Sequence, residues 1–365
     1  MTGDGRDHAF MARALQLGRR GFYTTDPNPR VGCVIVRGDE IIGEGWHERA
    51  GGPHAEVAAL RDAGDATGAT AYVTLEPCCH HGRTPPCTDA LLEARIARVV
   101  VAVKDPNPGV AGEGMAKLVA AGVDVECGIL EGEARALNPG FMQRMQIGRP
   151  FVRSKIAASL DGRTALANGT SQWITGAAAR GDVQRLRARS SAIMTGAGTV
   201  LAADPSLNVR AAELGDVQQP VRVVVDARLR MSPDAKTLGL PGAVMVMTAS
   251  NDAARCQALE RAGARVEHID PTVDGRVDLE SALARLGELD INEVLVEAGA
   301  GLNGALLQAG LIDELVVYMA GSVLGGDARG MFDTPELVDM SLRKEFELID
   351  VRRVGDDLRL TWRNR

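Results

Sequence analysis

Apolar positions in the first part of the chain alternate between short runs typical of buried strands and longer stretches with helical spacing. The short runs predict strands at residues 31–36, 41–46, 71–75, 98–103 and 123–126. The helical spacing predicts helices at residues 7–17, from 55 onward, 90–97 and 114–121. Since helices separate the later strands, we expect a sheet covered by helices on both faces.

The second part of the chain has the same alternation. Strand-like segments occur at residues 151–159, 192–196, 221–226, 243–247, 293–298, 314–320 and 358–362. Helical stretches separate them, which predicts a second α/β domain. Asn138, Pro139 and Gly140, followed by Gly148 and Pro150, interrupt the pattern and place the domain boundary near residue 147. The predicted domains are therefore residues 1–147 and 148–365.

The composition narrows the class of protein. With 365 residues, of which 45% are apolar and 24% charged, the chain is long enough for two ordinary globular domains. A net charge of −7 and only three Trp, three Tyr and six Phe argue against a nucleic-acid-binding surface and favour a small-molecule substrate. The polar N-terminus and the lack of a long apolar stretch predict a cytoplasmic protein without a membrane partner.

Five of the six cysteines precede residue 130, a clustering that favours metal binding or reactivity over disulfides in a chain of this kind. Three of them, Cys33, Cys127 and Cys256, lie in or beside apolar segments, and we expect them to be buried without a chemical role.

The remaining cysteines belong to a pattern that begins at "HAEVAAL". An isolated His-x-Glu is usually a surface feature of a helix start. Here, however, His54 is followed by Cys78 and Cys87, and one imidazole with two thiolates makes a three-ligand zinc site that keeps a position for water. Zinc lowers the pKa of such a water, and Glu56 is placed to move protons beside it without binding the metal.

Three neighbours of the metal cysteines leave the ligand set open. Cys79, His80 and His81 are also able to bind zinc, and spacing alone does not distinguish them from the three favoured residues. We interpret Cys79 as a spare thiol and His80 as a group of the pocket rather than a ligand.

The motif resembles the zinc-dependent cytidine deaminase superfamily. Within it, the nine-residue step from Cys78 to Cys87 in "PCCHHGRTPPC", together with "PNPRVGCVIV" and "KDPNP", is similar to the bifunctional riboflavin-biosynthesis deaminase-reductases. The similarity continues through "SKIAASLDGRTA", "SQWITG", "VLAADP", "VEAGAGLNGALL" and "GLIDEL", and so covers nearly the whole chain.

For the first domain the resemblance implies a cytidine-deaminase-like three-layer α/β/α fold. Its activity would be hydrolytic deamination of 2,5-diamino-6-ribosylamino-4(3H)-pyrimidinone 5′-phosphate. His54, Cys78 and Cys87 match zinc ligands, and Glu56 matches the catalytic proton shuttle. The positions that match the substrate pocket are Asn28, Arg83, Asp105 and Asn107.

For the second domain the resemblance implies a dihydrofolate-reductase-like α/β fold that uses NADPH to reduce the ribosyl group to ribityl. The positions that match cofactor contacts are Ala157, Trp173, Thr199, Gly299, Ala300, Gly301, Leu302, Asn303, Gly304 and Ala305. The positions that match substrate contacts are Ser171, Arg187, Leu207, Arg210 and Glu297. Arg187 and Arg210 are suited to phosphate because a guanidinium pairs with two oxygens at once.

The second half departs from related sequence patterns at two places. Gly299, Gly301 and Gly304 form a G-x-G-x-x-G after a strand, but Tyr318 and Met319 stand where a ribose-binding acid would follow, which disfavours an ordinary dinucleotide-binding domain. Ala203 stands where relatives often carry an aspartate, so that Asp204 alone would serve any acidic role there.

Two other functions stay open at this point. One is a nucleic-acid base deaminase with an unrelated accessory domain, and the other is a non-catalytic binding protein stabilised by zinc. The acidic charge counts against the first, and the open zinc position counts against the second. A homo-oligomer of the two-step enzyme is the assembly that we expect.

Overall fold

The computed structural model describes residues 5–80, 85–109 and 111–365. The chain divides into two compact units, Met1–Gly148 and Arg149–Arg365. No helix in the described ranges combines the length and the apolar composition that crossing a bilayer requires.

The described part of the first unit contains a five-stranded sheet in the order β2-β1-β3-β4-β5. Its strands are β1 (Gly32–Arg37), β2 (Glu40–Trp46), β3 (Thr70–Val73), β4 (Arg98–Val101) and β5 (Asp124–Cys127). Strand β1 is antiparallel to β2 and β3, whereas β3, β4 and β5 are parallel. The helices are α1 (Gly5–Gly18), η1 (Arg19–Gly21), α2 (Ala55–Ala63), α3 (Cys87–Glu93), α4 (Glu113–Ala120), α5 (Glu131–Leu137) and α6 (Pro139–Ile147).

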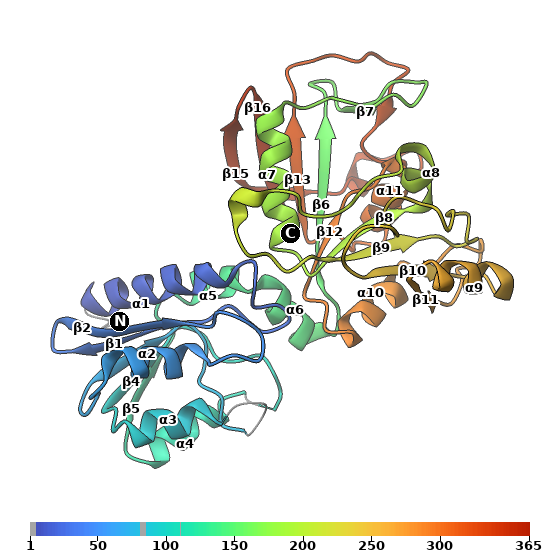
Figure 1. Ribbon diagram of the computed structural model, residues 1–365. Helices are drawn as coiled ribbons and strands as arrows, with labels where there is room; N and C mark the ends of the chain where they lie inside the picture. Colours follow the sequence, from blue (N-terminus) through green and yellow to red (C-terminus); the bar gives the residue numbers. More distant parts are fainter. Residues whose placement is uncertain (1–4, 81–84, 110) are drawn as a thin grey trace. The chain divides into compact units, whose positions relative to one another are not determined.

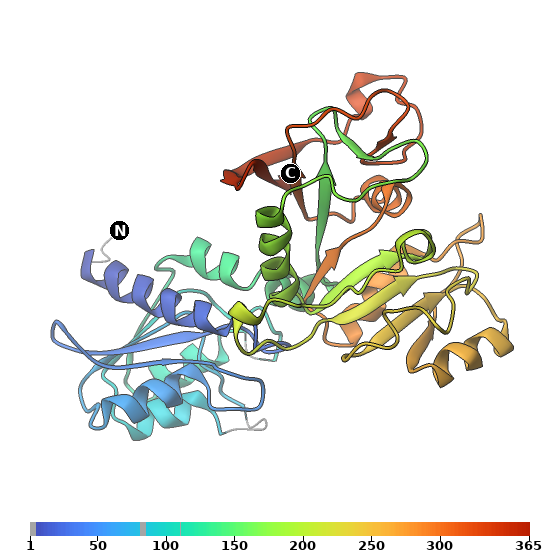
Figure 2. The same cartoon turned by 45° about the horizontal axis from the view of Figure 1, so that its top comes forward.

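Alternate residues of β1 show how the layers form. Val34 and Val36 pack with helices α1, α5 and α6, whereas Cys33 and Ile35 pack with α2, α3 and α4. Because successive side chains of a strand point to opposite faces, the sheet is buried on both sides. Figures 1 and 2 show α1 and α5 on one face and α2, α3 and α4 on the other. This is the expected three-layer arrangement.

A close approach between β2 and α2 fixes the start of the helix that carries His54 and Glu56. A Cβ at Gly45 would lie 2.3 Å from the backbone nitrogen of Ala59 and 2.5 Å from the carbonyl oxygen of Ala55. Only glycine therefore allows the helix to lie this near the strand, which is a reason of packing rather than of backbone torsion.

Two local expectations for this unit were wrong. The third helix begins at Cys87 and ends at Glu93, because the proline before Cys87 leads directly into the first turn. The interruption predicted at residues 138–140 is present as the junction between α5 and α6, where Pro139 takes the first helical position, which needs no N–H donor. Cys127 is exposed, since β5 is the edge strand of the sheet, whereas Cys33 and Cys256 are buried as expected.

The second unit contains, among its described residues, a nine-stranded sheet in the order β11-β10-β9-β8-β12-β6-β13-β16-β15. These strands are β6 (Phe151–Ala158), β8 (Ala192–Gly196), β9 (Val221–Val225), β10 (Val244–Thr248), β11 (Ala264–His268), β12 (Glu293–Val296), β13 (Glu314–Met319), β15 (Phe346–Val354) and β16 (Asp357–Asn364). All neighbours pair in parallel except at β13/β16 and β16/β15. The strands β7 (Arg163–Ala165) and β14 (Arg329–Gly330) form a separate pair.

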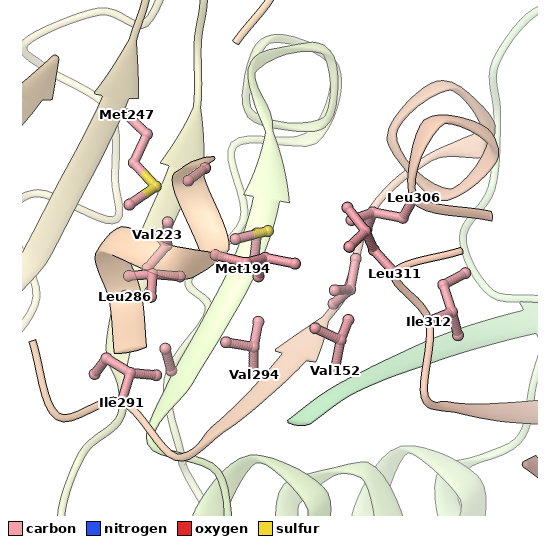
Figure 3. Packing of buried hydrophobic residues seen from close by; sticks show 14 of the residues in the cluster. Val152, Met194, Val223, Met247, Leu286, Ile291, Val294, Leu306, Leu311 and Ile312 are labelled. Atoms are coloured by element: carbon pink, nitrogen blue, oxygen red, sulfur yellow. The ribbon is translucent and has the colours of Figure 1, made fainter. Parts of the chain in front are cut away.

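Helices cover both faces of this sheet as well. They are α7 (Ala177–Ala188), α8 (Ala197–Ala203), η2 (Ala212–Leu214), α9 (Ala253–Arg261), α10 (Leu279–Glu288), α11 (Ala300–Gln308) and η3 (Met340–Leu342). Met194 and Val294 pack with Leu286 of α10 and Leu306 of α11 in the largest apolar cluster, seen in Figure 3. The neighbouring Ile193 packs against α7 on the opposite face. Strands β11 and β15 were not expected, because charged residues interrupt their apolar positions.

Candidate active sites

Residues predicted for deamination lie next to strand ends on one side of the first sheet. Since β2, β3 and β4 run in the same direction and β1 runs against them, the start of β1 and the ends of the other three strands share an edge. Asn28 precedes β1, His54 follows β2, Cys78 follows β3 and Asp105 follows β4. The topology thus brings together residues that are separated by up to about 80 positions in sequence.

His54, Cys78 and Cys87 form the cluster of potential metal ligands within the described residues, with ligand atoms all within 4.8 Å of one another. His54 is the residue before α2, and its Nδ1 lies 3.1 Å from Cys87 Sγ and 3.6 Å from Cys78 Sγ. The backbone N–H of Cys87 donates to Cys78 Sγ at 3.3 Å. One ring nitrogen and two sulfurs that converge from three segments fit zinc in donor type and number.

The two thiols are strongly coupled. The hydrogen bond from the Cys87 thiol, with help from His54 and against the effect of burial, lowers the pKa of Cys78 to about 4. The same hydrogen bond and burial raise the pKa of Cys87. Zinc binds both sulfurs as thiolates, so metal binding would release the proton that the coupled pair holds.

Glu56 lies in the first turn of α2 and is 3% exposed. Burial raises its pKa to about 7, with His54 acting in the opposite direction. A carboxyl group with a pKa near neutrality is suited to both accepting and donating a proton. Its place beside the metal cluster, outside the set of ligand atoms, is the placement that the sequence pattern predicted.

His47 connects Asn28 to this cluster, and the sequence analysis missed it. The Nδ1–H of His47 donates to the Pro53 carbonyl at 2.9 Å, which leaves Nε2 to accept from Asn28 Nδ2 at 3.0 Å. The buried His47 ring packs edge to face on His54, with centroids 5.5 Å apart. Burial lowers the pKa of His47 and favours the neutral ring. The position of His47 one residue after β2 was the available signal.

Asp105 and Asn107 lie together on the loop after β4. Asp105 Oδ1 accepts from the Asn107 N–H at 2.8 Å, and burial raises the pKa of Asp105 to about 6. Glu76, for which the sequence predicted no role in the site, organises this loop: its buried carboxylate accepts N–H groups of Asp105, Gly112, Gly114 and Met115 at 2.9–3.2 Å. A carboxylate at the start of α4 is also favoured by the helix dipole.

The other potential zinc ligands in the described residues lie outside the cluster of His54, Cys78 and Cys87. Cys79 is partly buried and His80 is exposed, and neither belongs to the cluster of ligand atoms. Burial raises the pKa of Cys79, which keeps its thiol protonated. His81 and Arg83 lie outside the described residues.

In the second unit the glycine motif leads into helix α11. Gly299 precedes the helix and its N–H donates to Thr199 Oγ1 at 3.3 Å, so that two predicted cofactor positions meet. The Asn303 side chain is 1% exposed and is bound within the domain, because Ser154 Oγ donates a hydrogen bond to its Oδ1 at 2.9 Å. A Cβ at Gly304 would lie 2.0 Å from the Asp333 carbonyl oxygen, so that this glycine serves packing.

Predicted substrate positions of this unit meet in a buried ion pair. Arg187 Nε and Nη2 donate to the two carboxylate oxygens of Glu297 at 2.6 and 2.8 Å, and Arg187 Nη1 donates to the Asn208 carbonyl at 2.9 Å. Although burial opposes it, the charge of Arg187 lowers the pKa of Glu297. Burial lowers the pKa of Lys155, while the charge of Glu297 raises it.

The other predicted positions are spread around this pair. Leu207 is buried against α7, Arg210 is exposed, and the backbone N–H of Arg210 donates to Gln184 Oε1 at 2.9 Å. Ser171 and Trp173 lie on an exposed segment, where the Arg180 guanidinium stacks over the indole at 4.5 Å. Ala157 lies near the end of β6, and Ala300, Gly301, Leu302 and Ala305 lie in α11, the helix after β12.

Asp204, the acid next to Ala203, is bound through one carboxylate oxygen to a neighbouring loop. Its Oδ1 accepts the Lys236 N–H at 2.8 Å, so it holds a turn of the neighbouring loop.

Comparisons with known proteins agree over the whole chain. Residues 4–103 match the cytidine and deoxycytidylate deaminase zinc-binding region, and residues 150–360 match the RibD C-terminal domain. The riboflavin biosynthesis protein RibD of Escherichia coli K12 is 50% identical over 97% of this chain and 98% of its own length. The chain belongs to the RibD family.

Solved structures of this family have the same fold. A RibD structure from Acinetobacter baumannii covers 99% of both chains with a TM-score of 0.91 at 49% identity. The diaminohydroxyphosphoribosylaminopyrimidine deaminase/5-amino-6-(5-phosphoribosylamino)uracil reductase of Thermotoga maritima covers 99% of both chains with a TM-score of 0.86 at 34% identity. These similarities confirm the expected fold class.

This RibD family member is therefore a bifunctional deaminase and reductase of riboflavin biosynthesis, with Zn²⁺ and NADPH as cofactors. The similarity to RibD over 97% of the chain argues against the two other functions considered from the sequence. Its substrate is a small molecule.

Proposed function

We propose that unit Met1–Gly148 performs the deamination and that unit Arg149–Arg365 performs the reduction. The substrate of the first step is 2,5-diamino-6-ribosylamino-4(3H)-pyrimidinone 5′-phosphate, and its deaminated product is the substrate of the second. The observation that carries the proposal is the convergence of His54, Cys78 and Cys87 beside the buried Glu56. Catalysis is proposed to occur in the cytoplasm.

In the first unit His54, Cys78 and Cys87 hold zinc, which supplies Lewis acidity that brings the pKa of a water molecule towards neutrality. Glu56 accepts a proton from the attacking water. The water oxygen bonds to the ring carbon that bears the amino group, and the bond from this carbon to nitrogen then breaks. Glu56 returns the proton to the departing nitrogen, which leaves as ammonia.

Asn28, Asp105, Asn107 and Arg83 are proposed to bind the deaminase substrate. His47 fixes the Asn28 amide through the contact at 3.0 Å, and Glu76 fixes the loop of Asp105 through four backbone N–H groups. Side chains that are held before the substrate arrives lose little freedom on binding it, which favours affinity.

In the second unit NADPH would supply a hydride to the ribosyl carbon that is bonded to nitrogen; the bond from this carbon to the sugar ring oxygen breaks, and that oxygen takes up a proton to become a ribityl hydroxyl. The glycine segment Gly299–Ala305, with Ala157, Trp173 and Thr199, is proposed to hold the cofactor. Ser171, Leu207, Arg210 and Glu297 are proposed to hold the substrate. Because Arg187 is already bound to Glu297, its role is to orient that carboxylate, and the exposed Arg210 is the phosphate partner.

Two assays on the same preparation test this assignment. Ammonia release is measured from the diaminopyrimidine phosphate without NADPH. NADPH oxidation is then measured with 5-amino-6-ribosylaminouracil 5′-phosphate, which is already deaminated. Both reactions are expected, and absence of either from folded, zinc-loaded protein would contradict the proposal.

A homo-oligomer is proposed as the assembly. The edge strand β15 exposes Leu348, Ile349 and Val351, whose exposed fractions are 46%, 46% and 53%. An apolar edge strand is a surface that proteins normally cover. Sedimentation velocity across a range of protein concentrations measures the state, and a monomer throughout would contradict this assembly.

A further inference from the structure

The segment Leu207–Arg210, between α8 and η2, contains two of the proposed substrate positions, Leu207 and Arg210. Leu207 is 2% exposed and packs with Val183 and Leu186 of α7, whereas Arg210 is exposed. Among the described residues, no backbone–backbone hydrogen bond involves this segment. Since backbone polar groups need partners, side chains from other segments must hold it in place.

Two glutamines bind the backbone of this segment. The Val209 N–H donates to Gln219 Oε1, and Gln219 Nε2 donates to the Val209 carbonyl, each at 3.0 Å. The Arg210 N–H donates to Gln184 Oε1 at 2.9 Å. Gln184 lies on α7 and Gln219 precedes β9, so the two amides come from different elements. A side chain that binds both backbone groups of one residue takes the place of a neighbouring strand.

The same segment is connected to the buried ion pair. Arg187 Nη1 donates to the Asn208 carbonyl at 2.9 Å, while the other nitrogens of this guanidinium bind the Glu297 carboxylate. Although burial opposes it, the charges of Arg187, Lys155 and Arg210 lower the pKa of that carboxylate. The charge of Arg210 therefore faces the region of the proposed substrate site.

The direction of Arg210 depends on its backbone. The Arg210 guanidinium is exposed and, within the described part of the chain, lies beside no carboxylate at ion-pair distance. Leu207 has a φ of 48°, in the left-handed region that residues other than glycine rarely adopt. Such a conformation persists only where surrounding contacts fix it. The hydrogen bonds from the glutamines are contacts of this kind.

We propose that Gln184 and Gln219 are positioning residues that hold Arg210 for the phosphate group of the reductase substrate. The inference rests on the proposed role of Arg210 as the phosphate partner. Each glutamine acts through the backbone of Val209 or Arg210. A guanidinium pairs with two phosphate oxygens only when it approaches them in the right direction. An arginine with a fixed backbone also loses less freedom when it binds.

Replacement of Gln219 by methionine tests this role, because methionine keeps the length of the side chain but lacks the amide. KM and kcat of the zinc-loaded full-length protein are measured with 5-amino-6-ribosylaminouracil 5′-phosphate and NADPH. The KM is expected to rise about 10-fold in Gln219→Met and about threefold in Gln184→Met, which loses one hydrogen bond instead of two. The kcat is expected to stay within about twofold. With the compound that lacks the phosphate, kcat/KM should stay within about twofold of the unsubstituted value.

The Arg210→Ala background separates positioning from a general structural effect. Alone, Arg210→Ala is expected to raise the KM for the phosphorylated substrate about 100-fold. Adding Gln219→Met should raise this KM by less than about twofold more, because a residue that acts through a guanidinium has no effect once the guanidinium is absent. A structural loss, in contrast, would be equal in both backgrounds.

Asn138→Leu is the matched control, because Asn138 binds a backbone in the same way. The Arg30 N–H donates to Asn138 Oδ1, and Asn138 Nδ2 donates to the Arg30 carbonyl, each at 2.8 Å. This pair belongs to the first unit. Asn138→Leu should therefore leave the KM of the reduction within about twofold, even where it lowers the unfolding temperature.

The outcomes distinguish the role of the glutamines from that of Arg210. If Arg210→Ala leaves the KM unchanged, the phosphate assignment fails, and the role of the glutamines fails with it. If Arg210→Ala raises the KM but both glutamine variants keep it normal, the positioning role is overturned and the phosphate assignment stands. An equal effect of Gln219→Met with and without Arg210 also overturns the positioning role. Circular dichroism checks folding, and Gln184→Met is tested in the same two backgrounds should Gln219→Met not fold.

Discussion

Arg187 and Glu297 form a bidentate ion pair in the second unit, with nitrogen to oxygen distances of 2.6 and 2.8 Å. Their side chains are only 10% and 12% exposed. Arg187 lies on α7 and Glu297 follows β12, so the pair connects a covering helix to the end of a central strand. The Arg187 guanidinium therefore fixes the orientation of the Glu297 carboxylate, which lies just before the proposed cofactor segment Gly299–Ala305.

Replacing Glu297 by Gln should impair both stability and substrate binding. The change leaves the Arg187 charge buried without its partner, and removing one member of a buried pair typically costs about 3–5 kcal/mol. We expect a lower unfolding temperature and a higher KM for the deaminated substrate. Glu314→Gln is a control for lost ion pairing away from the glycine segment, because it removes one of the two carboxylates that pair with the buried Arg153. The control should lose stability and keep its KM. A similar KM increase in both variants would show that the effect is general destabilisation.

Zinc content should distinguish Cys87 from Cys79. Cys87→Ser removes a proposed ligand, whereas Cys79→Ser changes a thiol outside the cluster of ligand atoms. The protein is expected to hold about one zinc per chain, and Cys87→Ser is expected to lose most of it while Cys79→Ser retains it. Metal analysis of the purified proteins, with circular dichroism as a check of folding, measures this. Equal loss from both variants would refute the ligand assignment.

Glu56→Gln should separate the two activities. It preserves side-chain size but removes the carboxylate that carries the proton, and general acid–base catalysis is typically worth about 10²- to 10⁴-fold. Ammonia release should fall by that factor while zinc stays bound. NADPH oxidation with the deaminated substrate should continue at its normal rate, since that reaction is proposed for the other unit. Near-normal ammonia release would remove Glu56 from the mechanism, and loss of both reactions would remove the separation of sites.

Asp7 should stabilise the first unit in a pH-dependent way. Its carboxylate accepts hydrogen bonds from Arg98 and from Tyr72, and the Arg98 contact lowers its pKa below the ordinary 3.8. A carboxyl group with a lowered pKa stabilises the folded state above its unfolded pKa, and this contribution is lost as the pH falls through the folded value. The difference in unfolding free energy between the unsubstituted protein and Asp7→Asn should thus be constant above about pH 5 and shrink below about pH 4.

Urea unfolding at several pH values measures this difference in free energy. It is taken from the transition in which the first unit unfolds. Asp39→Asn is the control, because the Asp39 side chain is 74% exposed in its pair with Arg6. The unfolding free energy of Asp39→Asn should stay close to that of the unsubstituted protein at every pH. A difference for Asp7→Asn that grows as the pH falls would contradict the sign.

Local patterns in the sequence were sufficient for the parts of the protein that depend on neighbouring residues. The spacing of His54 and Glu56 predicted their places around the start of α2, and the apolar runs predicted most strands of both sheets. The glycine motif was predicted to follow a strand, and in the structure it follows β12. These features are local because helix starts and strand faces follow from residues within a few positions of each other.

Contacts between distant segments were decided only by the tertiary structure. His47 reaches Asn28 across 19 positions, Glu76 collects N–H groups up to 39 positions away, and Arg187 meets Glu297 across 110. No periodicity encodes such pairs, because sheet order brings strand ends together and burial then makes an unpaired polar group costly. The sequence by itself thus determined the chemical groups of both sites, and the fold determined which partner each group has.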